Sequence, residues 1–346
     1  MASPGLLVMK PYLLGIALLI LLLATSVAYG AVDIPLGDVG GILLGMLNGK
    51  SDSLGLSASA IAIISKVRLP HTLLIALTGA ALAGSGAAFQ GLFRNPLADP
   101  YLIGVASGAG LGAVAAMSVH WPEDLLGFYL IPAGAFLGAL ITILLVYRLA
   151  RVGPIVPLTT LILAGVAISS FASALTSFLM LRADDRIYRA LAFLLGGSTL
   201  TGWKPVIVAF TYMLPGLIAL SLLGHKLNVL QFGEDQAKSI GLDVERAKTA
   251  VLVTATLTTA AAVAFSGVIG FIGLIVPHMI RITWGSDYRH LIPQSILFGA
   301  GSLLFADMLS RVILAPESIP VGIVTALAGT PFFLWILRRA KSEVFW

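Results

Sequence analysis

The chain has 346 residues, of which 58% are hydrophobic and 11% are charged, and it contains no cysteine. Soluble globular proteins carry about 25% charged residues, so this composition excludes a soluble enzyme and a nucleic-acid-binding protein. The absence of cysteine excludes a disulfide framework and thiolate metal sites. The excess of Lys and Arg that gives the net charge of +5 forms no basic cluster outside the apolar segments. We attribute this excess to orientation of the protein in a membrane. The sequence therefore predicts an integral membrane protein.

Stretches without charged residues predict where the chain crosses the membrane. A crossing helix needs about 20 apolar residues, because the hydrocarbon core is about 30 Å thick. Nine such windows occur, at 11–32, 69–93, 100–122, 125–147, 152–181, 205–225, 249–280, 290–306 and 318–337. The seventh window is too long for one span. Its two glycines predict a break at 266–270, between a full helix and a shorter helix that ends near Pro277.

Basic residues at the two ends of the chain predict the topology. Lys10 precedes the first window, and Arg338, Arg339 and Lys341 follow the last, which predicts that both termini are cytoplasmic. Two ends on one side need an even number of crossings, so we expect ten. Removal of the first window as a signal peptide would leave nine, and we therefore interpret it as a retained helix. The predicted fold is all-α, a single polytopic membrane domain over 1–346, with about ten transmembrane helices in two five-helix inverted repeats.

Glycine spacing indicates helix packing, and the motifs of common enzymes are missing. Gly104, Gly108 and Gly112 repeat every fourth residue, which is typical of close helix contact in membranes. The match of 108–113 to a dinucleotide-binding fingerprint follows no predicted strand, so we give it no weight. The sequence has no complete nucleotide-binding signature and no His pair at metal-ligand spacing. We therefore expect no catalytic residue, no metal site and no cofactor, and by elimination we expect a transporter.

The scarcity of charged residues inside the windows indicates how transport is driven. Asp307 and Arg311 lie four residues apart near the outer end of the ninth span, where they can pair on one helix face. The spans offer little else to bind a coupling ion. We therefore favour an external source of energy, and an ion-coupled secondary transporter is the alternative.

The largest cytoplasmic segment, 226–248, is a candidate docking surface. Its pattern predicts a short helix over 234–240 that Gly241 ends. Apolar side chains among the charges of this region suit contact with a partner subunit, namely Leu230, Phe232, Ala237 and Ile240. The alternative interpretation is a solvated loop.

Several sequence blocks resemble the permease subunits of type II ABC importers, the family that takes up iron–siderophore complexes, haem and cobalamin. These blocks occur in order along most of the chain. They are RLP at 68–70, GAALAGSG at 79–86 with Gln90, RNPLADP at 94–100, GFIGLIVPH at 270–278 with Arg281, Ala306 and Asp307 with Arg311, PVGIVTA at 320–326 and GTPF at 329–332. The resemblance implies a multi-pass protein of a prokaryotic plasma (inner) membrane.

The resemblance also implies partners. A permease of this kind is a homodimer in the lipid bilayer, contacts two cytoplasmic ATP-binding subunits and receives its cargo from an extracytoplasmic substrate-binding protein. The permease itself is not an enzyme, because the ATPase activity belongs to the partner subunit. The coupling region of the family matches Glu234, Ala237 and Gly241 here, and the small size of Ala237 and Gly241 would allow another backbone to approach closely.

On the outer face, the resemblance assigns docking of the binding protein to arginines beside the second and ninth spans. These positions are Arg68 and Arg311 here, and a third family arginine is replaced by His71. Histidine is charged only near or below about pH 6.5, so this replacement weakens one contact or makes it depend on pH. The alternatives are that Arg68 anchors the helix at the lipid headgroups and that Arg311 pairs internally with Asp307.

Few residues in the sequence indicate the route of the cargo through the membrane. Ser170, Ser173 and Ser177 form a stripe on one face of the fifth span, and the resemblance puts a cytoplasmic gate near Leu158 and Thr159. The alternative for the serines is ordinary hydrogen bonding between helices. The family's commonest cargo is an iron chelate or haem, with a corrinoid close behind, and the sequence does not choose among them.

Overall fold

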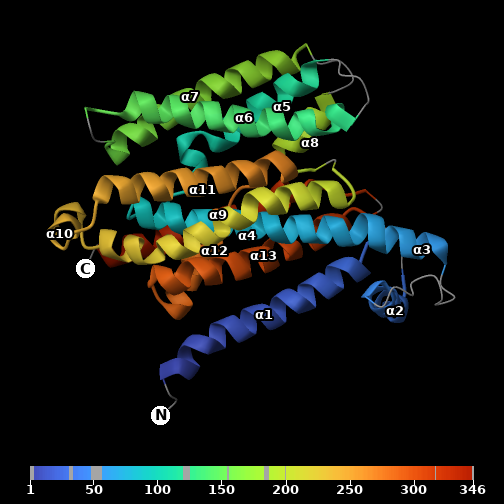
Figure 1. Ribbon diagram of the computed structural model, residues 1–346. Helices are drawn as coiled ribbons and strands as arrows, with labels where there is room; N and C mark the ends of the chain where they lie inside the picture. Colours follow the sequence, from blue (N-terminus) through green and yellow to red (C-terminus); the bar gives the residue numbers. More distant parts are fainter. Residues whose placement is uncertain are drawn as a thin grey trace.

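The computed structural model describes residues 4–30, 34–47, 57–119, 125–153, 156–182, 187–198, 200–315 and 317–344, and every regular element in these ranges is a helix. Ten helices correspond to the ten predicted spans (Figure 1). They are α1 (Pro4–Ala28), α4 (Leu69–Leu92), α5 (Val105–Ser118), α6 (Leu125–Ala150), α7 (Leu158–Met180), α9 (Trp203–Leu230), α11 (Val244–Ser266), α12 (Ile272–Trp284), α13 (Tyr288–Val312) and α14 (Val321–Val344). The predicted all-α fold is confirmed.

Shorter elements connect these helices. They are α2 (Leu36–Leu47), α3 (Ala58–Ala62), a π-helical stretch η2 (Ile63–Arg68), a 3₁₀ turn η3 (Pro100–Ile103), α8 (Ile187–Leu194) and α10 (Glu234–Ser239). The two chain ends lie at the same end of the bundle, which also carries α10 (Figure 1). This arrangement agrees with an even number of crossings.

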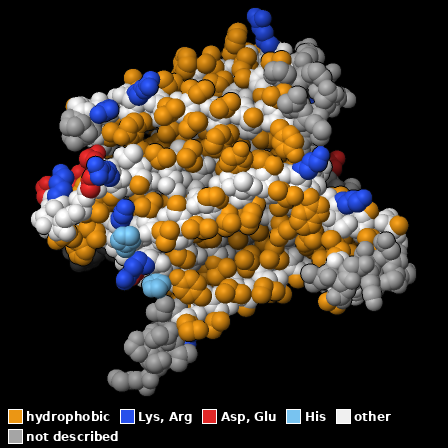
Figure 2. Space-filling view, in the orientation of Figure 1, with side chains coloured by type: hydrophobic (Ala, Val, Ile, Leu, Met, Phe, Trp, Pro, Cys, Tyr) orange, Lys and Arg blue, Asp and Glu red, His pale blue; other side chains and the backbone are white. Residues whose placement is uncertain are grey.

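Seven of the described helices are long and apolar enough to cross a membrane, which makes this a multi-pass membrane protein. Among the ten helices above, α5 and α12 are shorter, with 14 and 13 residues, and the apolar part of α14 is also short. Figure 2 shows a broad hydrophobic band between two ends where charged side chains gather. Such a band matches the apolar interior of a bilayer.

Helix α4 forms the centre of the bundle, since 83% of its membrane window is buried. It packs against α9, α11, α12 and α13. A Cβ atom on Gly79 would collide with the carbonyl of Gly299 in α13, and one on Gly86 would collide with the carbonyl of Gly273 in α12. Helices in lipid associate through such close backbone approach. The small residues of α4 therefore explain why it can occupy the centre.

The predicted glycine contact between α5 and its neighbour is also confirmed. A Cβ atom on Gly112 would collide with the carbonyl of Gly134 in α6, and one on Gly108 would collide with the carbonyl of Gly138. The repeat at every fourth residue keeps these positions on one face of each helix. The glycine repeat of α5 therefore serves helix packing, and not nucleotide binding.

The predicted break in the long seventh window is confirmed. Helix α11 ends at Ser266, and α12 begins at Ile272. Gly267 has a φ of +77°, which glycine adopts without strain, and Phe271 has a φ of +70°. The chain therefore leaves the helical conformation at this point, between two helices that both pack on α4.

The prediction that the shorter helix ends near Pro277 is wrong, because α12 continues to Trp284. Proline has no N–H, so the carbonyl four residues earlier, that of Gly273, loses its helical partner. The side chain of Gln90 in α4 compensates, since its Nε2 atom donates to the carbonyls of Gly273 (3.3 Å) and Leu274 (3.2 Å). A hydrogen bond from a neighbouring helix thus allows the proline to remain inside α12.

Candidate functional site

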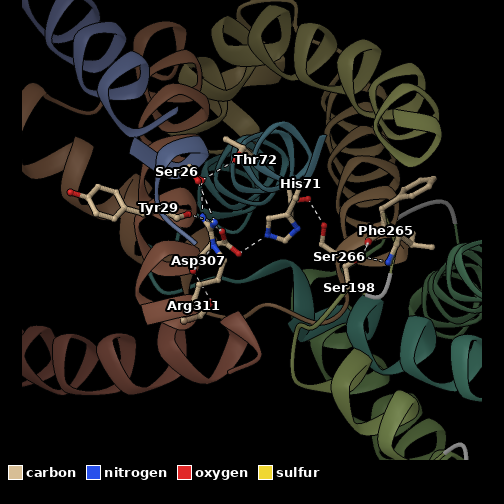
Figure 3. Close-up of polar contacts among 12 residues, drawn as sticks. Ser26, Tyr29, His71, Thr72, Ser198, Phe265, Ser266, Asp307 and Arg311 are labelled. Atoms are coloured by element: carbon tan, nitrogen blue, oxygen red, sulfur yellow. Dashed lines mark hydrogen bonds and ion pairs between the residues drawn. The ribbon is translucent and has the colours of Figure 1, made fainter. Parts of the chain in front are cut away.

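Three ionisable side chains meet at the end of the bundle opposite α10. Asp307 of α13 lies between His71 of α4 and Arg311, one turn further along α13 (Figure 3). The His71 Nε2 atom is 2.9 Å from Asp307 Oδ1, and Arg311 Nη2 is 2.9 Å from Asp307 Oδ2. The Asp307 side chain is only 5% exposed. A carboxylate buried to this degree needs such partners, because removal from water disfavours its charge.

The carbonyl groups at the end of α1 hold Arg311 in place. Its Nη1 atom donates to the carbonyls of Ser26 (3.2 Å) and Tyr29 (2.9 Å), and its Nη2 atom donates to Ser26 Oγ (2.8 Å). Ser26 also shares a hydrogen bond with Thr72 of α4. The arginine thus connects the last turn of α1 to α13.

Arg68 also binds the end of α1. It is the last residue of η2, and its Nη1 atom donates to the carbonyls of Val27 (3.2 Å) and Ala28 (2.6 Å). The last carbonyls of a helix have no partner within the helix and carry partial negative charge, so a buried cation suits them. Arg68 is 6% exposed. Its observed role is to cap α1, which differs from an anchor at the lipid headgroups.

These contacts bear unequally on the predicted docking residues. The alternative in which Arg311 pairs with Asp307 is confirmed. His71 and Arg311 also line a pocket of about 380 Å³ together with Asp307, Ser310 and Ser318. We call it the outer pocket, because this end of the bundle is the outer end in the predicted topology. Docking at Arg68, His71 and Arg311 stays a prediction, and Arg68 is the least accessible of the three. The sequence could not reveal its capping role, because Arg68 and Ala28 are 40 residues apart.

The predicted coupling segment forms the expected short helix at the other end of the bundle. Helix α10 covers Glu234–Ser239, and Gly241 has a φ of +90°. A Cβ atom on Gly241 would touch nothing, so this chain needs the glycine for its backbone conformation. Lys248 joins α10 to α11, since its Nζ atom lies 3.0 Å from Glu234 Oε1 and 3.2 Å from Glu245 Oε1.

The expectation that Ala237 offers space to a partner's backbone is wrong, because Ala237 is fully buried within this chain. Its small side chain lets α10 pack on its neighbours α9 and α11. Leu230 is buried as well, whereas Phe232 is 69% exposed and Ile240 is 67% exposed. A partner at this end would therefore contact Phe232 and Ile240.

The predicted pathway residues on α7 divide into two groups. Ser170 and Ser173 line a cavity of about 540 Å³, together with Asp99, Tyr101, Phe271 and Leu274. Thr159 and Ser177 are exposed but are not among its lining residues, and Leu158 is partly buried. Ser170 Oγ donates to the carbonyl of Val166 in its own helix (3.0 Å). This bond does not join two helices, unlike the alternative interpretation of the serine stripe.

Asp99 and Tyr101 are cavity residues that the sequence did not identify. Asp99 Oδ1 accepts a hydrogen bond from the backbone N–H of Tyr101 (2.7 Å) at the start of η3. The Tyr101 hydroxyl donates to the carbonyl of Ile269 (2.8 Å) and accepts from its N–H (3.2 Å). The RNPLADP block contained Asp99, but only the tertiary contacts bring it beside the loop before α12.

No group of three or more His, Asp or Glu side chains within the described ranges is arranged to hold a metal ion.

Comparison with known proteins identifies relatives along most of the chain. The model of the FecCD transport family matches residues 18–339. The cobalamin import system permease protein BtuC of Halobacterium salinarum is 44% identical over 284 residues, which cover 82% of this chain and 75% of that protein.

The hemin transport system permease protein HmuU of Yersinia pestis is 42% identical over 280 residues, which cover 80% of this chain and 83% of that protein. Among solved structures, a metal-chelate type ABC transporter in an inward-facing conformation matches with a TM-score of 0.80 at 28% identity. That match covers 96% of this chain and 99% of the other. The relatives thus agree on a membrane permease and differ in the cargo that their names state.

Proposed function

Because the chain belongs to the FecCD transport family, we propose that it is the membrane-spanning permease subunit of an ATP-driven importer for a metal chelate. The similarity to permeases for cobalamin and hemin supports this cargo class. An iron chelate or haem is the first choice and a corrinoid the second. The ten apolar helices supply the passage through the membrane, and the energy comes from a partner. An ion-coupled secondary transporter is not retained.

One observation carries the proposal: α10 lies at one end of the bundle (Figure 1), and two large apolar side chains beside it are exposed. Phe232 and Ile240 are each about two-thirds exposed, and charged side chains surround this end (Figure 2). An apolar contact within a charged rim is typical of a protein interface. We propose that a cytoplasmic ATP-binding subunit docks here, with Glu234 and Gly241 at the edge of the contact.

The outer pocket supports docking of a substrate-binding protein. Arg311 and His71 can present N–H groups to an acidic side chain of that partner, because arginine binds carboxylates with two parallel hydrogen bonds. Asp307 already occupies part of this capacity. We propose that the partner's carboxylate shares or replaces Asp307, and that Arg68 contributes indirectly by fixing the end of α1.

The exposed face of α7 supports a homodimer with a central pathway. Only 17% of its membrane window is buried within this chain, and Ser170 and Ser173 face the cavity. We propose that the two copies enclose this cavity between them. In that arrangement, the cytoplasmic gate lies near Leu158 and Thr159.

The proposal is tested by reconstitution of the chain in lipid vesicles with the ATP-binding subunit and the binding protein of the proposed importer. We expect ATP hydrolysis to rise when the binding protein carries its cargo, with a ferric siderophore, hemin and cobalamin tried in turn. The chain alone should hydrolyse no ATP. Accumulation of cargo that needs an ion gradient and no ATP would overturn the proposal.

A further inference from the structure

The cavity beside α7 contains one charged wall residue among the described residues that line it, namely Asp99. We propose that this cavity is filled with water and that the Asp99 carboxylate makes it attract cations. The cavity would then favour positively charged or hydrogen-bond-donating surfaces of a cargo over anionic surfaces.

The cavity lies where two helices are interrupted. One interruption is the turn η3 before α5, where Gly104 has a φ of +87°, and the other is the loop 267–271 before α12. Ser266 bonds to Thr78 of α4, and Gly273 contacts Gly86 of α4. These two contacts are eight residues apart, or about 12 Å along the helix, and both lie well inside α4. The loop therefore runs through the middle of the bundle.

Non-helical backbone at this depth is tolerated only when protein or water satisfies its polar groups. The Tyr101 hydroxyl satisfies both backbone groups of Ile269. Gly270 and Phe271 line the cavity itself. The two interruptions are thus joined by Tyr101, and together they build one wall of the cavity.

No described cation neutralises Asp99. Its Oδ1 atom accepts from the Tyr101 N–H, and none of the ion pairs among the described residues includes it. Asp99 as a residue is partly exposed. The other lining residues offer hydroxyl groups, at Ser169, Ser170 and Ser173, and otherwise mostly apolar surface. When ionised, this carboxylate has no counter-ion among the described residues and gives the cavity a negative potential.

Low-dielectric walls strengthen such a potential, because they confine the field lines to the opening. One unscreened charge near the path of a small ion can change its local concentration by about tenfold. The selection of cargo by this charge rests on the proposed transport function. The electrostatic property of the cavity does not, so the two can be tested separately.

The natural absence of cysteine allows a direct test on the full chain in membrane vesicles, without partners or ATP. Ser173→Cys places one thiol in the cavity. Its rates of reaction are measured with a cationic trimethylammonium-ethyl methanethiosulfonate and with the anionic sulfonato-ethyl reagent, each divided by the rate with a free thiol. We expect the cation to be favoured by about tenfold. Ser170→Cys serves as a second reporter.

The control variants separate charge from structure. Asp99→Asn keeps the oxygen that accepts from Tyr101 N–H and removes the charge, so the preference should fall towards one, whereas Asp99→Glu should keep it. Asp243→Asn removes the charge of another helix-capping aspartate, outside the cavity, and should change nothing. High salt should also weaken the preference in the variant that retains Asp99.

Three results would overturn the inference: a preference that Asp99→Asn leaves intact, no preference while Asp99 is present at low salt, or no reaction with either reagent at positions 170 and 173. Failure of ATP-driven uptake in the reconstituted importer would overturn the proposed function and leave these rates unaffected.

Discussion

The His71 Nε2 and Asp307 Oδ1 atoms lie 2.9 Å apart across the contact between α4 and α13, although the two residues are 236 positions apart in the sequence. Asp307 also pairs with Arg311, which in turn binds the end of α1. A single carboxylate therefore connects the central helix, α13 and α1 at the outer end of the bundle. A binding protein that draws Arg311 or His71 towards its own carboxylates would weaken these connections. If a binding protein docks here as proposed, its docking should therefore loosen the contacts among these three helices.

Asp307→Ala should destabilise the protein by about 3 kcal/mol, because it leaves the poorly exposed Arg311 without its carboxylate. The measurement is thermal unfolding of the purified chain in detergent. Asp243→Asn is the control, since Asp243 pairs with Arg246 at the exposed surface, the asparagine oxygen keeps the helix cap, and such exposed pairs contribute about 0–1 kcal/mol. Equal losses of thermal stability in the two variants would show that the ion pairs of Asp307 stabilise the protein no more than an exposed ion pair does.

Arg68 and Arg311 should respond differently to a change of charge. Arg68→Glu places an acid against the carbonyls of Val27 and Ala28, so it should lower the melting temperature and expose the end of α1 to protease. Arg311→Glu should also lower the melting temperature, because it puts a second acid beside Asp307 and the carbonyls of Ser26 and Tyr29. It should in addition reduce stimulation of ATP hydrolysis by the binding protein, because Arg311 lines the outer pocket. The double variant should abolish stimulation.

If Arg68→Glu keeps the wild-type melting temperature and still loses stimulation, the capping role is secondary and Arg68 docks directly. Unchanged stimulation in the double variant would remove the docking assignment altogether. Lys66→Glu is a suitable control for added negative charge near this end of the bundle, because Lys66 belongs to the same η2 stretch and is exposed.

Gln90 and Pro277 should be energetically coupled. Gln90→Leu removes the donor for the carbonyls of Gly273 and Leu274, and an unsatisfied buried acceptor costs about 1–3 kcal/mol. In a Pro277→Ala background, the new N–H of residue 277 can bond to the Gly273 carbonyl, so the same change should cost less. A double-mutant cycle on thermal unfolding measures this difference. A coupling energy near zero would mean that Gln90 does not compensate for the proline.

The part of the fold that depends on local composition was predictable. Gaps between charges located the ten helices, and the glycines at 267 and 270 located the break after α11. Pro277 misled the prediction, because its compensating partner Gln90 is distant in sequence. Arg68, Ala237 and Asp99 were misjudged or missed for the same reason: the capped carbonyls, the packed neighbours and the cavity exist only after helices assemble. Contacts that a local spacing encodes, such as the glycine face of α5 and the Asp307–Arg311 pair, were therefore predictable, whereas contacts between side chains far apart in the sequence were not.

Thr159 offers a test of the proposed gate. If two copies face each other near this residue, Thr159→Cys should form a disulfide between protomers under mild oxidation, and the bridge should stop ATP-driven uptake. Reduction should restore uptake, and Leu163→Cys, exposed one turn further along α7, is the matched control. A bridge at 159 that forms readily and leaves uptake intact would place the gate elsewhere.

Substitution of the exposed and of the buried apolar residues around α10 should affect different properties of the protein. The double variant Phe232→Ser with Ile240→Ser should leave the melting temperature nearly unchanged, because both side chains are largely exposed. It should reduce co-purification of the ATP-binding subunit by at least about tenfold, because it removes central apolar contacts of the proposed interface. Ala237→Leu should act in the opposite way, because α10 packs on its neighbours through Ala237 and a larger side chain there costs about 1–3 kcal/mol. Size-exclusion chromatography of the complex and thermal unfolding of the chain measure the two effects. Full assembly of the Phe232 and Ile240 double variant would show that the ATP-binding subunit docks on another surface.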